Sequence, residues 1–453
     1  MSEILSSGGH GKGYTSEYII EEVKKHDIKF IKLQFVDILG MVKNMSIPAC
    51  HIKKVLNNEM MLDGSSIKGF RSIETSDMCF VPDKDTFMVL PSIGRESKEA
   101  RLICDIYNPD MTPFAGCPRC NLKRVIKEAQ DLGYTMNLGP EAEFFLFKKD
   151  ENGMPLPITN DAAGYYDVMP DDPGEYVRND IIFNLQKMGF DIEASHHECA
   201  IGQHEIDFKY ADVLTTADNV VTFRTTVKAV AAQYGLHATF MPKPIFGKAG
   251  SGMHCNISLF KGKKNAFLDE SKPNGLSDIA LYSIGAMLKN VRSFTAVTNP
   301  TVNSYKRLVT GYEAPVYLAW SLANRSALIR VPAKRGNATR IELRSPDPSC
   351  NPYLAFAVLL ECCMDGIKNK IEPPEAVDAN IYTLTNKDRK RQKIESLPGN
   401  LIEAVGYMEK SPVVKAALGE HIFNEFITTK KKEWDSFRTY VSQWELDKYL
   451  LKY

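Results

Sequence analysis

The chain has 453 residues, and its 56 Lys+Arg balance 56 Asp+Glu, so its formal net charge is zero. This balance argues against a nucleic acid or an anionic membrane as the main partner. The hydrophobic share of 44% is enough for a globular protein to bury a large core. No apolar run reaches the roughly 18 residues that span a bilayer. The amino terminus also lacks an apolar signal core, so we expect a cytoplasmic protein.

The residue patterns divide the chain into a small domain followed by a large one. Residues 1–14 are small, polar and glycine-rich, which predicts a flexible N-terminus. Residues 15–108 predict a small mixed α+β domain, 109–120 a linker, and 121–453 the second domain. In the small domain we expect a helix at 14–25 and strands at 30–36, 86–90 and 101–107.

The large domain mixes strands and helices without the regular alternation of a doubly wound sheet. This pattern predicts an α+β fold with a largely antiparallel sheet. Most of the candidate functional residues fall on its strand patterns. Helical patterns occur at 121–131, 215–234, 277–298, 352–369 and 412–436.

Two carboxylates stand two residues apart on a hydrophobic strand pattern at 137–147. Because side chains alternate along a strand, Glu141 and Glu143 should share one face, with Ala142 and Phe144 on the other. Unpaired buried carboxylates cost several kcal/mol each, so these would need cations. An exposed sheet face is the alternative reading of this segment taken alone.

Other strand patterns also pair one polar face with one apolar face, which predicts a polar cavity lined by a sheet. Carboxylates with a single imidazole suit hard cations such as Mg²⁺ or Mn²⁺ better than zinc, and two pairs of neighbouring glutamates suggest two or more ions. The polar residues concerned are His254, Asn256 and Ser258 at 252–260, Arg340, Glu342 and Arg344 at 339–345, and Glu198, Glu205 and Asp207 between 196 and 207.

Arginines are a second signal, because seven of them fall between residues 292 and 344, interleaved with apolar residues. Guanidinium groups on such segments suit bidentate binding of carboxylate or phosphate oxygens. Divalent ions with converging arginines favour phosphoryl transfer, whose catalysis is mostly positioning and charge neutralisation. The seven are Arg292, Arg307, Arg325, Arg330, Arg335, Arg340 and Arg344.

Two further motifs carry less information. Cys117 and Cys120 form the only C-x-x-C, and without a second cysteine pair we interpret them as structural thiols at a helix start, not as a zinc site. The glycine-rich stretch 243–254 is neither a P-loop nor G-x-G-x-x-G. Its Gly250 and Gly252 would still let a ligand approach the backbone closely.

Six ordered elements together resemble the type I glutamine synthetase family over nearly the whole chain. The resemblance implies a β-grasp-like N-terminal domain and a catalytic domain with a curved antiparallel sheet flanked by helices. It also implies ATP-dependent ligation of ammonia to the γ-carboxylate of L-glutamate through γ-glutamyl phosphate (glutamate–ammonia ligase, EC 6.3.1.2). The elements are MLDGSSI at 61–67, GPEAEF at 139–144, HHE with GQHE at 196–205, KP with GSGMH at 243–254, NPT with YKR and GYEAP at 299–315, and RIELR at 340–344.

The resemblance assigns a role to each matching position. One metal site takes Glu143, Glu198 and Glu205, and the other takes Glu141, His254 and Glu342. Nucleotide contacts fall on Glu193, Asn256, Ser258, Arg325, Arg330 and Arg340. Glutamate contacts fall on Gly250, Arg307, Glu313, Arg325 and Arg344. Catalytic groups are Asp63, Glu313, Arg325 and Arg344.

The resemblance further implies an assembly. Asp63 would reach the active site of a neighbouring subunit and, with Glu313, bind ammonium and accept its proton. The aromatic-rich segment 430–453 would join two stacked hexamers into a dodecamer. A transcription regulator or a PII-type protein is a further candidate partner.

Some positions depart from the family pattern. Ala249 stands where many relatives have Asn, which removes a polar contact to glutamate. The stretch 164–177 has no long insertion, so the chain resembles the shorter branch, which is not adenylylated and is regulated by feedback. Arg71 is then the candidate sensor of glutamine, and no modification is expected at Tyr382.

Two alternatives remain at this stage. A relative with the same fold could join glutamate to another amine, such as a polyamine, but the Asp63–Glu313 pair favours ammonium. A non-catalytic, regulator-binding assembly should have lost metal or arginine positions, and all six expected ligands are present.

Overall fold

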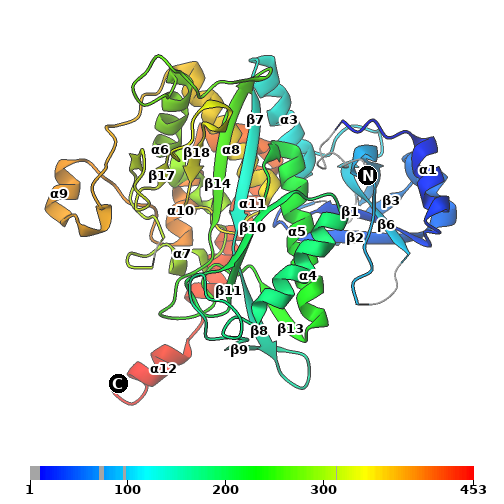
Figure 1. Ribbon diagram of the computed structural model, residues 1–453, viewed down its shortest axis with the longest axis horizontal. Coiled ribbons are helices and arrows are strands. Elements are labelled where there is room, and N and C mark those ends of the chain that lie inside the picture. Colours follow the sequence, from blue (N-terminus) through cyan, green and yellow to red (C-terminus); the bar gives the residue numbers. More distant parts are fainter. Residues whose placement is uncertain (1–10, 71–75, 95–97, 313) are drawn as a thin grey trace.

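The computed structural model describes residues 11–70, 76–94, 98–312 and 314–453. A small domain, blue to cyan in Figure 1, lies at one end of a larger body that contains the rest of the chain. Both domains mix helices and strands, which confirms the expected α+β class. None of the helices in the described ranges is long and apolar enough to cross a membrane.

The small domain is one mixed sheet in the order β2-β1-β6-β4-β3, with β5 paired to β6. The predicted alternation of its first strand is confirmed, because Ile31 and Leu33 are fully buried. Its elements are α1 Ser16–Lys25, β1 Phe30–Val36, β2 Val42–Pro48, α2 Ile52–Leu56, β3 Met61–Asp63, β4 Asp77–Pro82, β5 Met88–Val89 and β6 Glu99–Tyr107.

The strand expected at 86–90 is shorter than predicted. Asp83 caps a 3-10 turn at Lys84–Thr86 by accepting the amide of Asp85, so only β5 Met88–Val89 remains extended. The local side-chain hydrogen bond therefore overrides the apolar run that suggested a strand.

The large domain contains two sheets that meet where β7 runs into β8. One has the order β12-β7-β14-β18-β17-β16, and the other the order β10-β11-β8-β13. All pairings in both sheets are antiparallel except β16 with β17. The strands are β7 Thr135–Ala142, β8 Phe144–Lys149, β9 Pro155–Thr159, β10 Ile192–His197, β11 Gln203–Phe208, β12 Ala211–Asp212, β13 Leu236–Thr239, β14 Met253–Lys261, β15 Lys264–Asn265, β16 Trp320–Ser321, β17 Ile329–Arg330 and β18 Ile341–Leu343.

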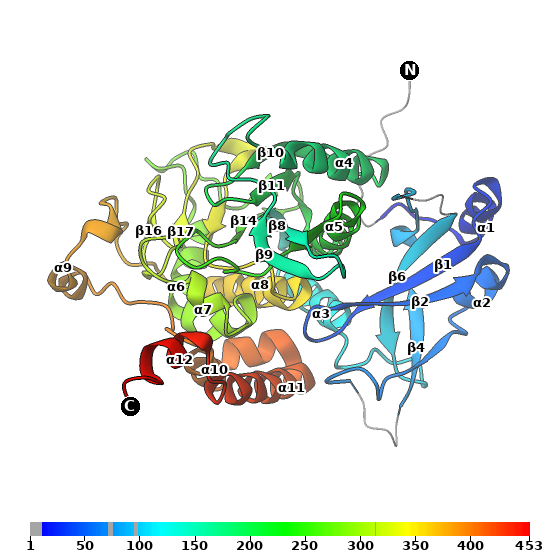
Figure 2. The same ribbon diagram turned by 90° about the horizontal axis from the view of Figure 1, so that it is seen from below.

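Helices cover these sheets, and α6, α8, α10 and α11 pack against one another as a layer (Figure 2). The apolar stretch of α8 is buried on nearly all sides, as expected for a helix that is apolar around its whole circumference. The helices are α3 Pro118–Asp131, α4 Gly174–Lys187, α5 Val213–Gln233, α6 Asp278–Thr298, α7 Ser304–Arg307, α8 Pro352–Asn369, α9 Asn386–Arg391, α10 Leu401–Met408, α11 Pro412–Arg438 and α12 Gln443–Tyr449.

A buried arginine at the start of α3 joins the two domains. The Arg119 guanidinium lies 2.8 Å from Asp83 and 2.9 Å from Asp105 of the small domain, and 2.9 Å from Asp218 of α5. Because α3 begins at Pro118, the helix includes the last three residues of the stretch 109–120 that we expected to be a linker. This junction is therefore an ordered, ion-paired joint.

Candidate active site

A cavity of about 670 Å³ opens in the large domain, where the two sheets meet. It gathers residues from Glu141 to Tyr382, which lie far apart along the chain. The sequence-predicted residues that line it are Glu141, Glu143, Glu198, Glu205, Gly250, His254, Arg307, Arg325, Arg330, Glu342 and Arg344.

Strand register brings one set of three metal-type ligands together. In the central strand β14, His254 pairs with Glu141 of β7, while Asn256 pairs with Glu342 of β18. His254 Nδ1 lies 3.1 Å from Glu141 Oε2 and 3.7 Å from Glu342 Oε1. The ligand atoms of all three side chains fall within 4.8 Å of one another, which is suitable for sharing one cation.

Glu141 is held as a carboxylate. Burial acts to raise its pKa, but the hydrogen bond and charge of His254 and the amide of Asn256 outweigh burial, and the pKa is lowered to about 2. The Asn256 Nδ2 donates to Glu141 Oε1 at 2.8 Å, and Arg340 Nε in turn donates to Asn256 Oδ1 at 2.9 Å. Asn256 and Arg340 thus support the ligand from behind the cavity wall.

A second group of acidic residues occupies the other side of the cavity. Glu143 lies between β7 and β8. Its carboxylate accepts a hydrogen bond from the backbone amide of Gly252 at 3.0 Å and one from the side-chain amide of Gln203 at 2.6 Å. Glu198, in the turn between β10 and β11, lies 2.8 Å from His196 Nε2. Within the same group, the ligand atoms of His196, Glu205 and Asp207 lie within 4.8 Å of one another.

This second group carries more negative charge than its neighbours can balance. Burial and the charge of Glu198 raise the pKa of Glu143 to about 8. Burial and Asp207 raise the pKa of Glu205 well above its usual value, and burial and Glu141 raise that of Asp207 to about 6. A bound cation would remove this repulsion, so the donor set fits a hard divalent ion.

The guanidinium groups of two arginines contact Glu342, a member of the first set of ligands. Arg330 Nη1 lies 2.7 Å from Glu342 Oε2, and Arg344 Nε lies 3.1 Å from Glu342 Oε1. Arg307 is buried and donates to the carbonyls of Ser345 at 2.7 Å and Arg344 at 3.1 Å, which fixes its position at the cavity wall. The site therefore combines cationic groups that can neutralise an anionic substrate with carboxylates that can hold cations.

Besides Asn256 and Arg340, which support Glu141 from behind the wall, three described site residues from our predictions do not line this cavity within one chain. Asp63, at the end of β3, is exposed; the Ser65 hydroxyl and amide donate to it at 2.7 and 2.8 Å and lower its pKa. Glu193 is exposed on β10, and Ser258 pairs with Asn137 further along β14. Glu313 and Arg71 lie outside the described residues.

The cavity also contains residues that our sequence analysis did not assign to the site. Asp207, which the strand pattern placed among the polar residues of the cavity without a specific role, stands two residues after Glu205 on the same strand face. The others come from loops whose sequences gave no such pattern. The further lining residues include Tyr165, Tyr166, His196, Gln203, Tyr312, Asn324, Asn380 and Tyr382.

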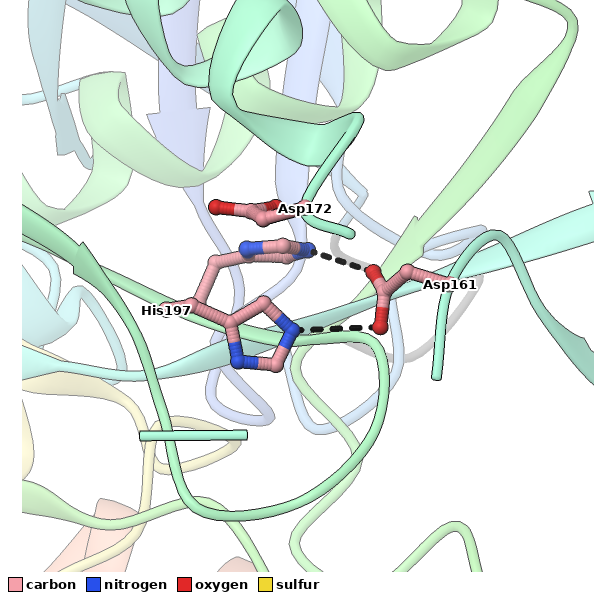
Figure 3. A group of neighbouring side chains, drawn as sticks. Asp161, Asp172 and His197 are labelled. Atoms are coloured by element: carbon pink, nitrogen blue, oxygen red, sulfur yellow. Dashed lines mark hydrogen bonds and ion pairs between the residues drawn. The ribbon is translucent and has the colours of Figure 1, made fainter. Parts of the chain in front are cut away.

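A buried network lies behind the turn that carries Glu198 (Figure 3). Asp161 Oδ1 lies 3.1 Å from His197 Nε2 and accepts the Gly202 amide at 2.8 Å. His197 Nδ1 lies 2.7 Å from the Glu198 carbonyl oxygen. Asp161 thus fixes both ends of the β10–β11 turn.

The same network contains four ligand-type side chains, but an arginine makes it unsuitable for a metal. Asp172 and His204 join Asp161 and His197, with ligand atoms within 4.8 Å of one another. Arg178 Nη1 lies 2.8 Å from His204 Nδ1, and Arg178 Nη2 lies 2.7 Å from Asp172 Oδ2. Since arginine only donates, His204 Nδ1 accepts, and its Nε2 carries the proton. That nitrogen has no lone pair for a metal, so the network is structural.

Comparisons with known proteins identify the family of this chain. The family model described as "Glutamine synthetase, catalytic domain" matches residues 115–449, and "Glutamine synthetase, beta-Grasp domain" matches residues 27–109. A glutamine synthetase of Clostridium saccharobutylicum is 58% identical over 440 residues, which cover 97% of this chain and 99% of the relative. One of Staphylococcus aureus strain N315 is 56% identical over 441 residues, with the same coverage.

Two solved structures are similar over almost their full length. The structure titled "GmaS/ADP complex-Conformation 1" aligns with a TM-score of 0.87 at 30% identity, covering 95% of this chain and 99% of that one. The cryoEM structure of Plasmodium falciparum glutamine synthetase aligns with a TM-score of 0.86 at 26% identity, covering 98% and 100%.

Proposed function

The chain belongs to the glutamine synthetase family and is a glutamate–ammonia ligase, and we propose that its reaction takes place in the cavity where the two sheets meet. The observation that carries this proposal is the opposition, in one cavity, of buried carboxylates and arginine side chains. The γ-carboxylate of glutamate is a poor acyl donor, so ATP must first convert it to an acyl phosphate. That step gathers negative charge, which this cavity can balance.

Members of this family use ATP and a divalent metal ion, and the carboxylates and the His254 imidazole of the cavity are suitable ligands for that ion. We propose two or more Mg²⁺ or Mn²⁺ ions, held in two sets: Glu141, His254 and Glu342, and Glu143, Glu198 and Glu205. Bound there, the ions would supply positive charge beside the phosphate oxygens. The unbalanced charge around Glu143 and Glu205 supports this assignment.

The arginines hold and orient the two anionic substrates. Arg325 lines the cavity, and Arg330 and Arg344 line it beside Glu342; the three would grip the nucleotide phosphates and the transferred phosphoryl group. Arg307 would bind the substrate glutamate beside Gly250. A side chain at Gly250 would clash with the Pro242 carbonyl, at 2.3 Å from its Cβ, so only glycine fits at this position of the cavity lining.

Asp63 supports an active site shared between subunits. Its carboxylate is ionised and exposed, yet it does not line the cavity of its own chain. We propose that it completes a neighbouring subunit's site, where with Glu313 it binds ammonium and accepts the proton that ammonium must lose. The assembly would be a dodecamer of two stacked hexamers.

Ligation of a different amine is not favoured. Curated relatives that are 56–58% identical to the chain are named glutamine synthetase, and this favours ammonium as the amine. The structures titled GmaS are only 30% identical to the chain.

Glutamine formation from glutamate, ammonium and ATP tests the function. Activity should require all three substrates and a divalent ion, and Glu141→Gln should lower kcat by at least about 100-fold because it removes a ligand charge. Glu151→Gln, on an exposed loop, is the matched control and should keep full activity. A faster reaction with ethylamine or a polyamine than with ammonium would replace glutamine formation by the alternative activity.

A further inference from the structure

Two cysteines meet at the first turn of α3, beside the joint between the domains. Cys117 is the N-cap residue of this helix, and Cys120 lies three residues further on. Their sulfur atoms lie within 4.8 Å of each other. C-x-x-C at a helix start is a spacing at which proteins form reversible disulfides.

The neighbouring backbone favours a negative charge on one sulfur. The Ile106 amide of β6 donates to Cys117 Sγ at 3.4 Å, and the Cys120 thiol lies 3.8 Å from the Ile106 carbonyl oxygen. Burial acts to raise the pKa of Cys117, but hydrogen bonds from Cys120 and from backbone amides outweigh it and lower the pKa. The positive end of the α3 dipole acts in the same direction.

A metal is a poor occupant of this pair. The nearest third ligand is Asp105, whose carboxylate oxygens lie 2.9 Å from Arg119 Nη1 and 2.6 Å from Lys123 Nζ. These two cations already balance Asp105, and they would repel a divalent ion beside it. Two sulfurs alone do not complete the tetrahedral set that zinc requires.

We propose that Cys117 and Cys120 form a reversible dithiol–disulfide site, oxidised by small disulfides such as oxidised glutathione. The two sulfurs differ in access, because Cys117 is 2% exposed and Cys120 is only partly buried. Cys120 is therefore the sulfur that an external disulfide reaches, and Cys117 is the one that completes the exchange. This proposal does not depend on the assignment of the active site.

The reaction balances as two exchanges. The Cys120 thiol gives its proton to solvent, and its sulfur attacks the external disulfide, forms a mixed disulfide and releases one thiolate. The Cys117 sulfur then loses a proton, attacks Cys120 Sγ and expels the second thiolate. The protein loses two protons and two electrons, which together are two hydrogen atoms, and the external disulfide becomes two thiols.

The two cysteines lie beside the ion-paired joint between the two domains. Arg119, whose guanidinium bridges the small domain and α5, lies between the two cysteines in sequence. A disulfide would form within the helical turn that presents this arginine, so the site lies at the ion-paired joint.

Peptide mapping of the full-length protein tests the proposal. After equilibration with mixtures of reduced and oxidised glutathione and alkylation of free thiols, the peptide with both cysteines should lose two hydrogen atoms and resist alkylation. Dithiothreitol should restore both thiols. Cys120→Ser should abolish the disulfide, whereas Cys50→Ser, at an exposed cysteine on the small domain, should leave it unchanged.

Several results would overturn it. Complete alkylation of both thiols after full oxidation, or stable single attachment of glutathione to Cys120, would mean that the disulfide does not form. Zinc bound in a one-to-one ratio and lost in Cys120→Ser would show a metal site instead. Mapping of the unmodified chain remains decisive even where a variant fails to fold.

Discussion

Two glutamates only two positions apart, Glu141 and Glu143, have opposite protonation behaviour. His254 and Asn256 lower the pKa of Glu141 to about 2, whereas burial and the charge of Glu198 raise that of Glu143 to about 8. At neutral pH the first is a ready cation ligand, and the second holds a proton until a cation takes its place. The surroundings of each glutamate, and not its residue type, therefore determine its pKa in the cavity wall.

This difference predicts that divalent metal binding depends on pH. Because Glu143 must lose a proton to ligate, Mn²⁺ affinity should rise about tenfold per pH unit below about pH 8 for one displaced proton, then level off. Calorimetric titration with Mn²⁺ from about pH 6 to about pH 9, in buffers of different ionisation enthalpy, measures both affinity and proton release. Glu143→Gln should weaken binding and reduce this pH dependence, whereas Glu151→Gln should change neither. An affinity independent of pH would show that Glu143 does not exchange a proton for the metal.

At the level of elements, the sequence-based predictions were most accurate where one periodic pattern determines both the helix or strand and the positions of its site residues. The alternation along β14 places His254, Asn256 and Ser258 opposite four buried apolar residues, as expected. Five long helical patterns are also confirmed, with ends shifted by a few residues where side chains cap them, as Asp212 caps α5. The strand predicted at 86–90 is reduced to Met88–Val89 because a capping aspartate, not periodicity, decides the conformation of the residues before it.

The remainder of the site depends on contacts between distant segments. Asp161 precedes His197 by 36 residues, and Arg178 reaches His204 across 26. His197 and His204 belong to the sequence element at 196–205, but no spacing pattern connects them with Asp161 or Arg178. Their role is visible only when α4 and the β10–β11 turn are placed against each other.

Loss of the Asp161 charge should therefore weaken metal binding from a distance. Asp161→Asn loses the carboxylate that holds His197 and the Gly202 amide, so the turn with Glu198 should loosen. Mn²⁺ affinity should fall by about 10–100-fold, the range typical of groups that orient ligands. Asp191→Asn, at an exposed ion pair with Lys209, is the matched control.

The experiment must distinguish a loss of Mn²⁺ affinity caused by a displaced β10–β11 turn from a loss caused by unfolding of the variant. Calorimetric Mn²⁺ affinity should be compared at a temperature where circular dichroism shows both variants folded, and Asp161→Glu should restore part of the loss. Unchanged affinity in folded Asp161→Asn would mean that the turn keeps its geometry without this carboxylate.

At the level of the whole molecule, the carboxyl-terminal helix stands apart from the body. α12 projects beyond the rest of the large domain in Figure 1. Its aromatic rings contact one another, with Trp444 and Tyr449 centroids 5.6 Å apart, yet Trp444 is 63% exposed and Leu451 97% exposed. A projecting apolar segment of this kind is typical of a contact between subunits. This supports the proposed role of 430–453 between two rings.

Removal of residues 440–453 should therefore change assembly more than folding. The full-length protein should have the mass of a dodecamer, and the truncated chain should form hexamers, because the exposed apolar segment would no longer be buried between rings. Light scattering coupled to size-exclusion chromatography measures both masses at matched concentration. The midpoint of thermal unfolding should remain similar at low protein concentration, since the deleted residues are mostly exposed in the single chain. Lys452→Ala, which keeps the apolar residues, should assemble as the full chain does. A dodecamer that survives the truncation would assign the ring contact to another surface.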